Sequence, residues 1–194
     1  MAVEYHIYDQ KFFQNTLELE ADSAVAAVAV FYEQFKPKSV IDIGCGCGIY
    51  LKYFAERGVE IIGYDGSPAA LKESLVGDKI KIFDLARPLR LEKKFDLALC
   101  LEVAEHLEEK DADTLVETLI NLSNTIIFTA AVPGQGPRSI GHINEQWPEY
   151  WIAKFVSKGF TFQEKLTARL KEKLKDKNVV WWLTQNLMIF SRQK

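Results

Sequence analysis

Residues 40–48 read VIDIGCGCG, and this stretch decides the class of fold. The apolar residues around Asp42 predict a buried strand, and glycines at positions 44, 46 and 48 predict a tight turn into a helix that begins near Ile49. In an open parallel sheet, ligands bind beyond the carboxyl ends of the strands, and glycine lets the backbone approach them closely. The stretch therefore predicts a ligand-binding turn at the edge of an α/β sheet.

The spacing of the glycines separates this turn from that of dinucleotide-binding folds. Those folds use the pattern G-x-G-x-x-G, which sets a pyrophosphate on a helix N-terminus. Here the third glycine, Gly48, comes one residue early, and Ile49 stands where the pattern needs glycine. A nicotinamide-dependent dehydrogenase is therefore the least favoured hypothesis for this chain.

Short apolar runs alternate with amphipathic stretches after this turn. Strands are predicted at residues 39–43, 60–64, 79–83, 95–101 and 125–132. Helices are predicted at about 49–57, 67–76 and 110–123. Strands joined through helices need crossover connections, so the sheet is expected to be mainly parallel and covered on both faces.

Further elements flank this alternation on both sides. Two helices, at about 9–19 and 22–35, are predicted before the first strand. The later part of the chain predicts a helix at about 148–158, a strand near 160–163, a basic helix near 164–176 and a last strand near 186–190. The fold class predicted is thus α/β, with a doubly wound, mainly parallel seven-stranded sheet. We expect one domain over 1–194, with 1–37 as a helical cap and 38–194 as the core.

Composition and charge bound the class of protein. The chain has 194 residues, 48% of them hydrophobic, and a formal net charge of −3, which is typical of one soluble globular domain. Residues 164–194 hold eight Lys/Arg against three Asp/Glu, whereas residues 1–163 hold sixteen against twenty-four. A basic tail on an acidic body disfavours nonspecific binding to duplex nucleic acid, and a solvated helix face is its ordinary explanation.

Cysteine usage and the N-terminus predict the compartment. Three cysteines are an odd number without the spacing of a disulfide framework, which favours a reducing environment. The first residues contain no apolar segment of a secretory signal, and the longest apolar run near them, 24–32, is too short to span a bilayer. We therefore expect a cytoplasmic protein without a membrane partner.

Two more acids follow predicted strands. Asp65 ends the run IIGYD, where a carboxylate can accept hydrogen bonds from both hydroxyls of a ribose. The alternative is a helix start, because Ser67 and Pro68 also suit the first positions of a helix. Asp84 follows the third strand, where a plain turn residue is the alternative to a ligand contact.

The glycine turn and the acid after the second strand resemble the class I S-adenosylmethionine-dependent methyltransferases, over residues 39–190. The resemblance implies their Rossmann-like fold and S-adenosylmethionine as cofactor. It implies that the glycines border the methionine moiety, that Asp42 orients its ammonium, that Asp65 binds the ribose, and that Asp84 and Leu85 lie at the adenine end. The cofactor-binding residues expected on this basis are Asp42, Gly44, Cys45, Gly46, Gly48, Asp65, Gly66, Asp84, Leu85, Leu101 and Glu102.

The segment after the fourth strand, LEVAEH at 101–106, carries the information about chemistry. The segment lacks the Asn-Pro-Pro-Tyr type of motif found in methyltransferases that act on amides or adenine, and it lacks the Pro-Cys motif of cytosine C5 methyltransferases. It is similar to the corresponding segment of small-molecule and O-directed methyltransferases. A helix directly after the strand would put Glu102, Glu105 and His106 on one face, toward the site. His106 is then a candidate general base, with a hydrogen-bonded residue of the site wall as the alternative.

A divalent metal site is a second interpretation of the same segment. Glu102, Glu105, His106 and His142 resemble the ligand spacing of small-RNA 3′-terminal 2′-O-methyltransferases and of some quinone-biosynthesis O-methyltransferases. Mixed carboxylate and imidazole ligands suit Mg, Mn or Zn. The Glu-x-x-Glu-His segment also occurs in metal-free relatives, so the expectation is a site without metal, and the metal site is the alternative.

Two more regions are candidates for contact with an acceptor. The loop and helix start GHINEQWPEYW, 141–151, place His142 as a catalytic candidate after the fifth strand, with helix capping as the alternative. The aromatic N-terminus could cover the pocket and exclude water, or pack in the core. Its members are Tyr5, His6, Tyr8, Phe12 and Phe13.

The function expected is transfer of a methyl group from S-adenosylmethionine to a small-molecule acceptor, with His106 and His142 as catalytic residues. One alternative is a metal-assisted 2′-O-methyltransferase of an RNA end, and another is a noncatalytic cofactor-binding domain. The acceptor and the oligomeric state do not follow from the sequence.

Overall fold

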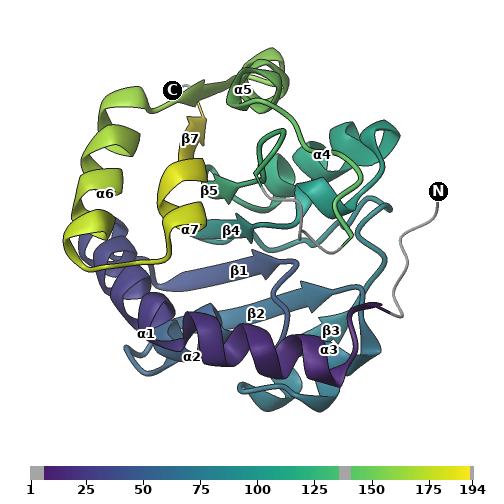
Figure 1. The fold of residues 1–194 in the computed structure, drawn as a ribbon. Coiled ribbons are helices and arrows are strands. Elements are labelled where there is room, and N and C mark those ends of the chain that lie inside the picture. Colours follow the sequence, from purple (N-terminus) through teal and green to yellow (C-terminus); the bar gives the residue numbers. More distant parts are fainter. Residues whose placement is uncertain (1–6, 136–140, 193–194) are drawn as a thin grey trace.

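The computed structural model of the chain describes residues 7–135 and 141–192. Within these residues one seven-stranded sheet has the order β3-β2-β1-β4-β5-β7-β6 (Figure 1). Its strands are β1 Ser39–Ile43, β2 Glu60–Asp65, β3 Ile80–Ile82, β4 Leu97–Leu101, β5 Thr125–Thr129, β6 Phe160–Phe162 and β7 Met188–Arg192. The pairs among β1 to β5 are parallel, and β7 runs antiparallel to both β5 and β6. The predicted mainly parallel seven-stranded α/β sheet is confirmed.

Helices cover both faces of this sheet (Figure 1). They are α1 Gln10–Phe35, α2 Ile49–Ala55, α3 Pro68–Lys72, α4 Ala112–Leu122, α5 Pro148–Ser157, α6 Glu164–Asp176 and α7 Trp181–Asn186. Short 3₁₀ turns lie at Gly77–Lys79, Ala104–His106 and Glu109–Asp111. None of the helices in this described part of the chain is both long and apolar enough to cross a membrane.

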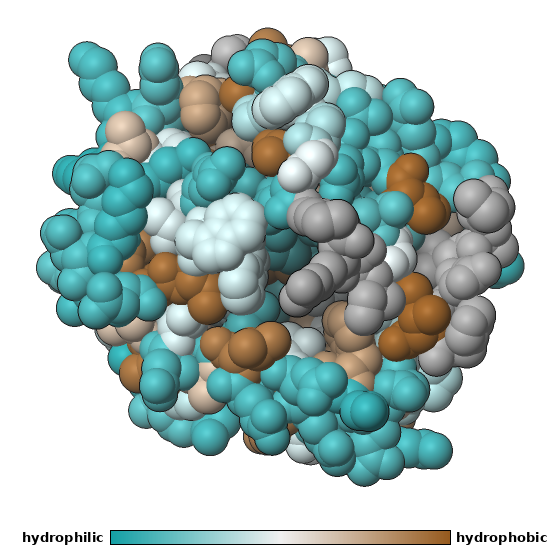
Figure 2. Space-filling view, viewed as in Figure 1, coloured by the Kyte–Doolittle hydropathy of each residue, from teal (hydrophilic) through white to brown (hydrophobic). Residues whose placement is uncertain are grey.

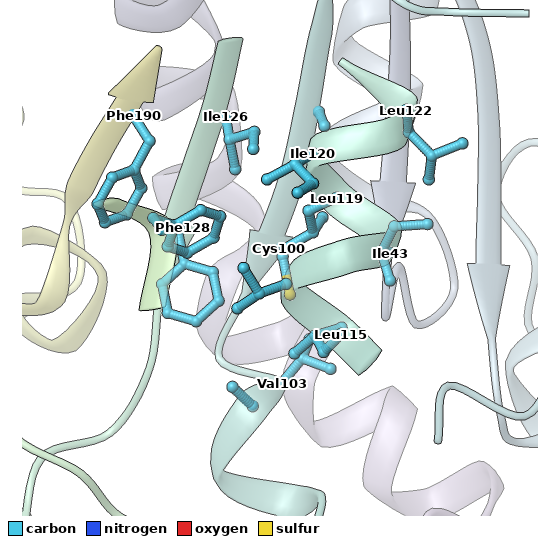
Figure 3. Packing of buried hydrophobic residues seen from close by; sticks show 14 of the residues in the cluster. Ile43, Cys100, Val103, Leu115, Leu119, Ile120, Leu122, Ile126, Phe128 and Phe190 are labelled. Carbon is cyan, nitrogen blue, oxygen red and sulfur yellow. The ribbon is translucent and has the colours of Figure 1, made fainter. Parts of the chain in front are cut away.

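Two apolar clusters, one on each face, hold the layers together. Side chains alternate along the strands: Cys100 of β4 and Phe128 of β5 belong to the cluster under α4 and α5, whereas Leu99 and Ile127 belong to the cluster under α1, α2, α6 and α7. Figure 3 shows Leu119 of α4 beside Cys100 of β4, within the cluster that also contains Ile120 and Phe128. Continuous burial along β1 and β4 fits parallel strands covered on both sides.

The N-terminal segment differs from its prediction. One continuous helix of 26 residues, α1, replaces the two helices expected at 9–19 and 22–35. In the middle of this helix Ser23 and Ala24 are buried against the body of the protein, and Ser23 Oγ accepts a hydrogen bond from Val180 N at 3.0 Å. Tertiary contacts therefore stabilise the helix across the residues that separate the two predicted helices.

Smaller differences concern element ends. The fifth strand ends at Thr129 rather than at residue 132, and the predicted last strand at 186–190 begins only at Met188. The short helix α7 ends at Asn186 and was not predicted. Ends of elements depend on long-range pairing, which local periodicity does not contain.

The exposed surface is mainly hydrophilic. On the face of the molecule drawn in Figure 2, hydrophobic residues form only small, separate groups between polar residues. Individual exposed apolar side chains include Leu19, Trp147 and Trp181, which are 68%, 59% and 53% exposed. Scattered apolar residues of this kind are ordinary on a protein surface and need no ligand to explain them.

The order of the strands creates a natural ligand site. The chain winds outward from β1 to β2 and β3, and then returns to place β4 on the other side of β1. At such a reversal the connections after β1 and β4 diverge and leave a crevice at the carboxyl ends of the strands. The glycine turn and the segment after β4 both begin there.

Candidate active site

A cavity of about 230 Å³ lies at this reversal, at the carboxyl ends of β1, β2 and β4 and beside the N-terminal half of α1. Ten of the residues predicted from the sequence line it: Asp42, Gly44, Cys45, Gly46, Asp65, Gly66, Leu85, Leu101, Glu102 and His106. Residues from three strand ends are thus brought together as predicted. The cavity belongs to the class of concave sites that bind small molecules.

The glycine turn gives the cavity its backbone wall. Gly44 has φ 81° and Gly46 has φ 51°, in the left-handed region that favours glycine. A Cβ atom on Gly44 would overlap the side chain of Val103, so only glycine fits between β1 and the segment after β4. Gly44 N donates to Tyr64 O at 2.7 Å and thereby ties the turn to β2.

One carboxylate oxygen of Asp42 has no hydrogen-bond partner among the described residues. Its side chain is 2% exposed and lines the cavity, and its Oδ1 forms no hydrogen bond with the described residues. Burial, and then the charge of Asp65, raises the pKa of Asp42 to about 7. A buried carboxylate that lacks a donor fits a site in which a ligand supplies that donor.

Asp65 supports the turn from the end of β2. Its Oδ2 accepts from Gly46 N and its Oδ1 accepts from Ser67 N, both at 2.8 Å. Burial raises the pKa of Asp65, while these backbone hydrogen bonds lower it in part. The cap of α3 is Ser67, whose hydroxyl accepts from Ala69 N. Asp65 is therefore placed toward the cavity rather than used as the helix cap.

Three predicted site residues do not line the cavity. Gly48 caps the start of α2 with φ 81°. Asp84 is exposed, with its carboxylate 3.2 Å from Arg87 Nε, although the neighbouring Leu85 does line the cavity. His142 stands behind His106, with their ring centroids 4.8 Å apart.

The chain does not become helical directly after β4, contrary to the expectation. Glu102 adopts a left-handed conformation with φ 53°, and a 3₁₀ turn begins only at Ala104. The carboxylate of Glu102 accepts from Asn186 Nδ2 at 3.0 Å, and Glu102 N donates to Thr129 Oγ1 at 2.9 Å. Glu102 therefore lines the cavity from a bend, and it does not share a helical face with the residues that follow.

His106 contacts the N-terminal segment across the cavity. Its Nδ1 is 2.8 Å from the Tyr8 hydroxyl and 3.2 Å from Gly141 O. A carbonyl only accepts, so the contact with Gly141 puts the imidazole proton on Nδ1 and the lone pair on Nε2. Burial, and then the charge of His142, lowers the pKa of His106 to about 4, so the ring is neutral near pH 7.

His142 is oriented by an acid of its own loop. Its Nδ1 is 2.9 Å from Glu145 Oε1, and Glu145 Oε2 accepts from Gly134 N at 2.9 Å. Because a carboxylate accepts, His142 donates to Glu145 from Nδ1. Both imidazoles thus contact oxygen atoms of the protein through Nδ1.

Three of the four residues of the alternative metal site come together. Ligand atoms of Glu105, His106 and His142 lie within 4.8 Å of one another, while Glu102 is outside this group. Glu105 is fully buried, and its carboxylate oxygens make no hydrogen bond of ordinary geometry with the described residues. Burial, followed by the charge of Glu102, raises the pKa of Glu105 well above its usual range.

The aromatic N-terminus is placed in part. Tyr8, Phe12 and Phe13 line the cavity, and Ser67 Oγ donates to Tyr8 O at 2.7 Å. Tyr5 and His6 lie outside the described residues, as do residues 136–140 of the loop after β5. The described aromatic side chains thus form one wall of the cavity, as expected of a cover that excludes water.

The sequence interpretation missed two polar residues of the cavity, Glu20 of α1 and Tyr50 of α2. The Tyr50 hydroxyl donates to Glu20 Oε2 at 3.2 Å. Glu20 could have been found, because it falls on the same helical stripe as the buried Phe13 and Ala24, where an acid is unexpected. We call the part of the cavity wall formed by Glu20, Asp42 and Glu102 the carboxylate end.

Comparison with known proteins identifies a family that matches this chain. The family model of a methyltransferase domain matches residues 13–156. The mitochondrial ubiquinone biosynthesis O-methyltransferase of Schizosaccharomyces pombe is 33% identical over 91 residues, which are 41% of this chain and 33% of that protein. The chain thus aligns with only about a third of the length of the curated relatives that it first matches.

Solved structures share the fold at lower identity. A S-adenosylmethionine-dependent methyltransferase from Archaeoglobus fulgidus has a TM-score of 0.69 at 18% identity, covering 94% of this chain and 98% of that one. Magnesium protoporphyrin IX methyltransferase from Synechocystis PCC 6803, solved with bound S-adenosylhomocysteine, has a TM-score of 0.59 at 20% identity and covers 78% of both chains. With the family match over most of the chain, the protein belongs to the methyltransferase domain family and has the fold of the class I S-adenosylmethionine-dependent methyltransferases.

Proposed function

We propose that this protein is an enzyme that transfers a methyl group from S-adenosylmethionine to a small-molecule acceptor. The charge of the cavity carries the proposal. Four carboxylic acids line it, and the described lining residues include no lysine or arginine. These acids are Glu20, Asp42, Asp65 and Glu102. A cavity of this kind favours a cationic ligand, and S-adenosylmethionine carries both a sulfonium and an ammonium.

The chain's own residues fit that cofactor. Asp42 offers a buried oxygen without a partner, Asp65 stands at the end of β2 for the ribose, and the glycine turn lets the backbone approach the methionine part. When bound, S-adenosylmethionine would supply a methyl group on a sulfonium: an acceptor lone pair would attack this carbon in line, and the carbon–sulfur bond would break to leave S-adenosylhomocysteine. Alignment by the cavity then provides most of the acceleration expected for such a reaction.

His106 is the candidate for proton removal. It is neutral near pH 7, lines the cavity, and holds its lone pair on Nε2 while Tyr8 and Gly141 occupy Nδ1. A neutral imidazole at this place can accept the proton of an acceptor hydroxyl as that oxygen is methylated. His142, oriented by Glu145, stands directly behind it.

An acceptor with a hydroxyl group fits the relatives and the charge distribution. Curated relatives are named for ubiquinone and tocopherol O-methylation. The basic helix α6 contacts Glu33 and Gln34 at the C-terminal end of α1, whereas residues near the other end of this helix line the cavity. No lysine or arginine is among the described residues that line the cavity, so the cavity wall favours no anionic acceptor.

A metal-assisted O-methyltransferase is the second candidate, because one observation favours it. Glu105, His106 and His142 form a compact group whose mixed ligands suit Mg, Mn or Zn. A metal there would lie beside the cavity wall at His106, where it could polarise an acceptor oxygen. Action on an RNA end would need cationic side chains for phosphate, and the described cavity wall has none.

The compartment proposed for the enzyme is the cytoplasm. One domain is proposed, in which residues 1–37 form a cap and residues 38–194 form the core. The three cysteines, Cys45, Cys47 and Cys100, are free and buried, which supports a reducing compartment. A small molecule is the partner proposed, with no membrane.

A methyl-transfer assay tests this function. The purified protein is incubated with S-adenosylmethionine labelled in its methyl group and with pools of phenolic metabolites, RNA and peptides, with and without divalent metal. Label transferred to a metabolite hydroxyl supports the proposal. Binding of S-adenosylhomocysteine without transfer to any pool would instead identify a noncatalytic cofactor-binding domain.

A further inference from the structure

Glu20 occupies a position of α1 that packing alone does not explain. The buried stripe of this helix contains Phe13, Ala24 and Ala27, and Glu20 falls on it with the spacing of three or four residues that marks one helical face. Its neighbour Glu18 is exposed. Glu20 itself is half-buried. Withdrawing a carboxylate even partly from water is unfavourable unless it gains a partner, so this position calls for a polar function.

Among the described residues that line the cavity, Glu20 has neutral donors but no cation. The Tyr50 hydroxyl donates to Glu20 Oε2 at 3.2 Å, and hydrogen bonding from Tyr50 and Trp182 lowers the pKa of Glu20 in part. Burial is the larger influence and raises that pKa, and the charge of Glu102 adds to it. With no lysine or arginine among the described lining residues, a positive charge has to come from a ligand.

Two more acids, Asp42 and Glu102, line the same cavity as Glu20 and Tyr50. The charges of all three acids raise the pKa of the buried Tyr50 hydroxyl. Asp42 Oδ1, fully buried and without a hydrogen-bond partner among the described residues, belongs to the wall of the same cavity. Three acids that share a desolvated wall repel one another, and a bound cation would relieve that repulsion.

We propose that Glu20 is a further cofactor-recognition residue, which completes with Asp42 and Glu102 a receptor for the ammonium group at the amino-acid end of S-adenosylmethionine. The inference rests on the proposed function. Asp42 belongs to β1 and Glu102 directly follows β4, whereas Glu20 belongs to α1, so cofactor binding ties this helix to the sheet. The part of α1 next to Glu20 carries Phe12 and Phe13, and their cover over the cavity is held in place by the same contact.

Two ligands that differ in the amino-acid part test the proposal by calorimetry. S-adenosylhomocysteine has the ammonium and carboxylate, and 5′-methylthioadenosine has the same nucleoside and sulfur but neither charged group. Glu20→Gln keeps the size of the side chain and removes its charge. Glu18→Gln makes the same change on an exposed position of the same helix and is the matched control.

Glu20→Gln is expected to weaken S-adenosylhomocysteine about tenfold, as is usual for loss of one charge-assisted hydrogen bond, and to change 5′-methylthioadenosine less than about twofold. Tyr50→Phe removes only the donor to Glu20. It is expected to weaken S-adenosylhomocysteine more than 5′-methylthioadenosine, by a smaller factor than Glu20→Gln does. Circular dichroism checks that each variant is folded.

Equal changes for the two ligands, including no change, would overturn the role of Glu20 and would leave the proposed function standing. If the unaltered protein binds neither ligand, the proposed function fails and the inference fails with it. A loss for both ligands in Glu18→Gln as large as in Glu20→Gln would show a general effect of charge on α1 and would also contradict the proposal.

Discussion

The carboxylate end of the cavity and its histidine end, formed by His106 with His142 and Glu145 behind it, solve different chemical problems. At the carboxylate end, acids with raised pKa values stand close together and have no cationic partner among the described lining residues. At the histidine end, each imidazole is oriented through Nδ1 by an oxygen atom of the protein. We propose that the first end receives a positive charge and that the second accepts a proton, a division of work that suits methyl transfer from a sulfonium.

The largest effect is expected at the histidine end. His106→Ala removes the candidate base and the partner of the Tyr8 hydroxyl, and is expected to lower turnover about 100-fold or more while changing S-adenosylhomocysteine affinity less than threefold. His142→Ala is expected to lower turnover by about tenfold. Turnover is measured with the acceptor found in the pooled assay, and affinity by calorimetry. Equal losses of turnover and affinity would contradict the division between the two ends.

Loss of affinity is expected when Asp65 is changed. Asp65→Ala removes the acceptor of Gly46 N and Ser67 N together with the proposed ribose contact, so S-adenosylhomocysteine should bind about 100-fold more weakly. Asp84→Ala is the control, because Asp84 is exposed and does not line the cavity. A change below threefold is expected there, and a loss as large as that of Asp65→Ala would restore the adenine role that the sequence suggested for Asp84.

The affinity for S-adenosylhomocysteine is expected to depend on pH through Asp42. Its pKa is about 7 in the ligand-free protein, and the ionised carboxylate binds an ammonium much more strongly than the neutral carboxylic acid does. Affinity should therefore rise about tenfold per pH unit toward pH 7 and level off above it. Calorimetry between pH 5 and 8.5 measures this, and Asp42→Asn is expected to abolish the slope. A wild-type profile as flat as that of the variant would contradict the assignment.

The same group affects stability with the opposite sign. A carboxyl whose pKa is higher in the folded state stabilises the fold fully below its unfolded value near 3.8, and this contribution is lost as pH rises through about 7. Ligand-free Asp42→Asn should accordingly lose less free energy of unfolding between pH 4 and 7 than the unaltered protein. Urea titration at the two pH values provides the comparison.

The smallest effect is expected from removal of metal. With His106 as a base and no metal, treatment with a chelator should change turnover less than twofold. Loss of turnover on chelation, restored by Mg, Mn or Zn, would instead favour the group of Glu105, His106 and His142 as a metal site. That outcome would leave the carboxylate end untouched and would change the account of the histidine end only.

The features predicted correctly from the sequence are those whose cause is local. The glycine turn follows a buried strand directly, and alternation of apolar runs with helices implies a mainly parallel sheet. The acids at strand ends are likewise visible in the sequence, and Asp42, Asp65 and Glu102 all line the cavity.

The features that were missed depend on distant contacts. Glu102 is held by Asn186, 84 residues further along the chain, and Tyr8 reaches His106 across 98 residues. Residues in the left-handed conformation are most often glycine, so the glutamate at position 102 gives no sign of this conformation in the sequence. The helix expected directly after β4 was therefore wrong. The continuity of α1 and the role of its stripe likewise depend on packing against α2 and α7, which periodicity alone does not reveal.

Binding of S-adenosylhomocysteine to the unaltered protein tests the central claim most directly. Calorimetry at pH 7.5 should show saturable binding to one site with a Kd of about 10 µM or tighter, a free energy near −7 kcal/mol. Absence of binding up to about 1 mM ligand would contradict the account, because the unpartnered Asp42 and the acid-lined cavity would then serve some other cation.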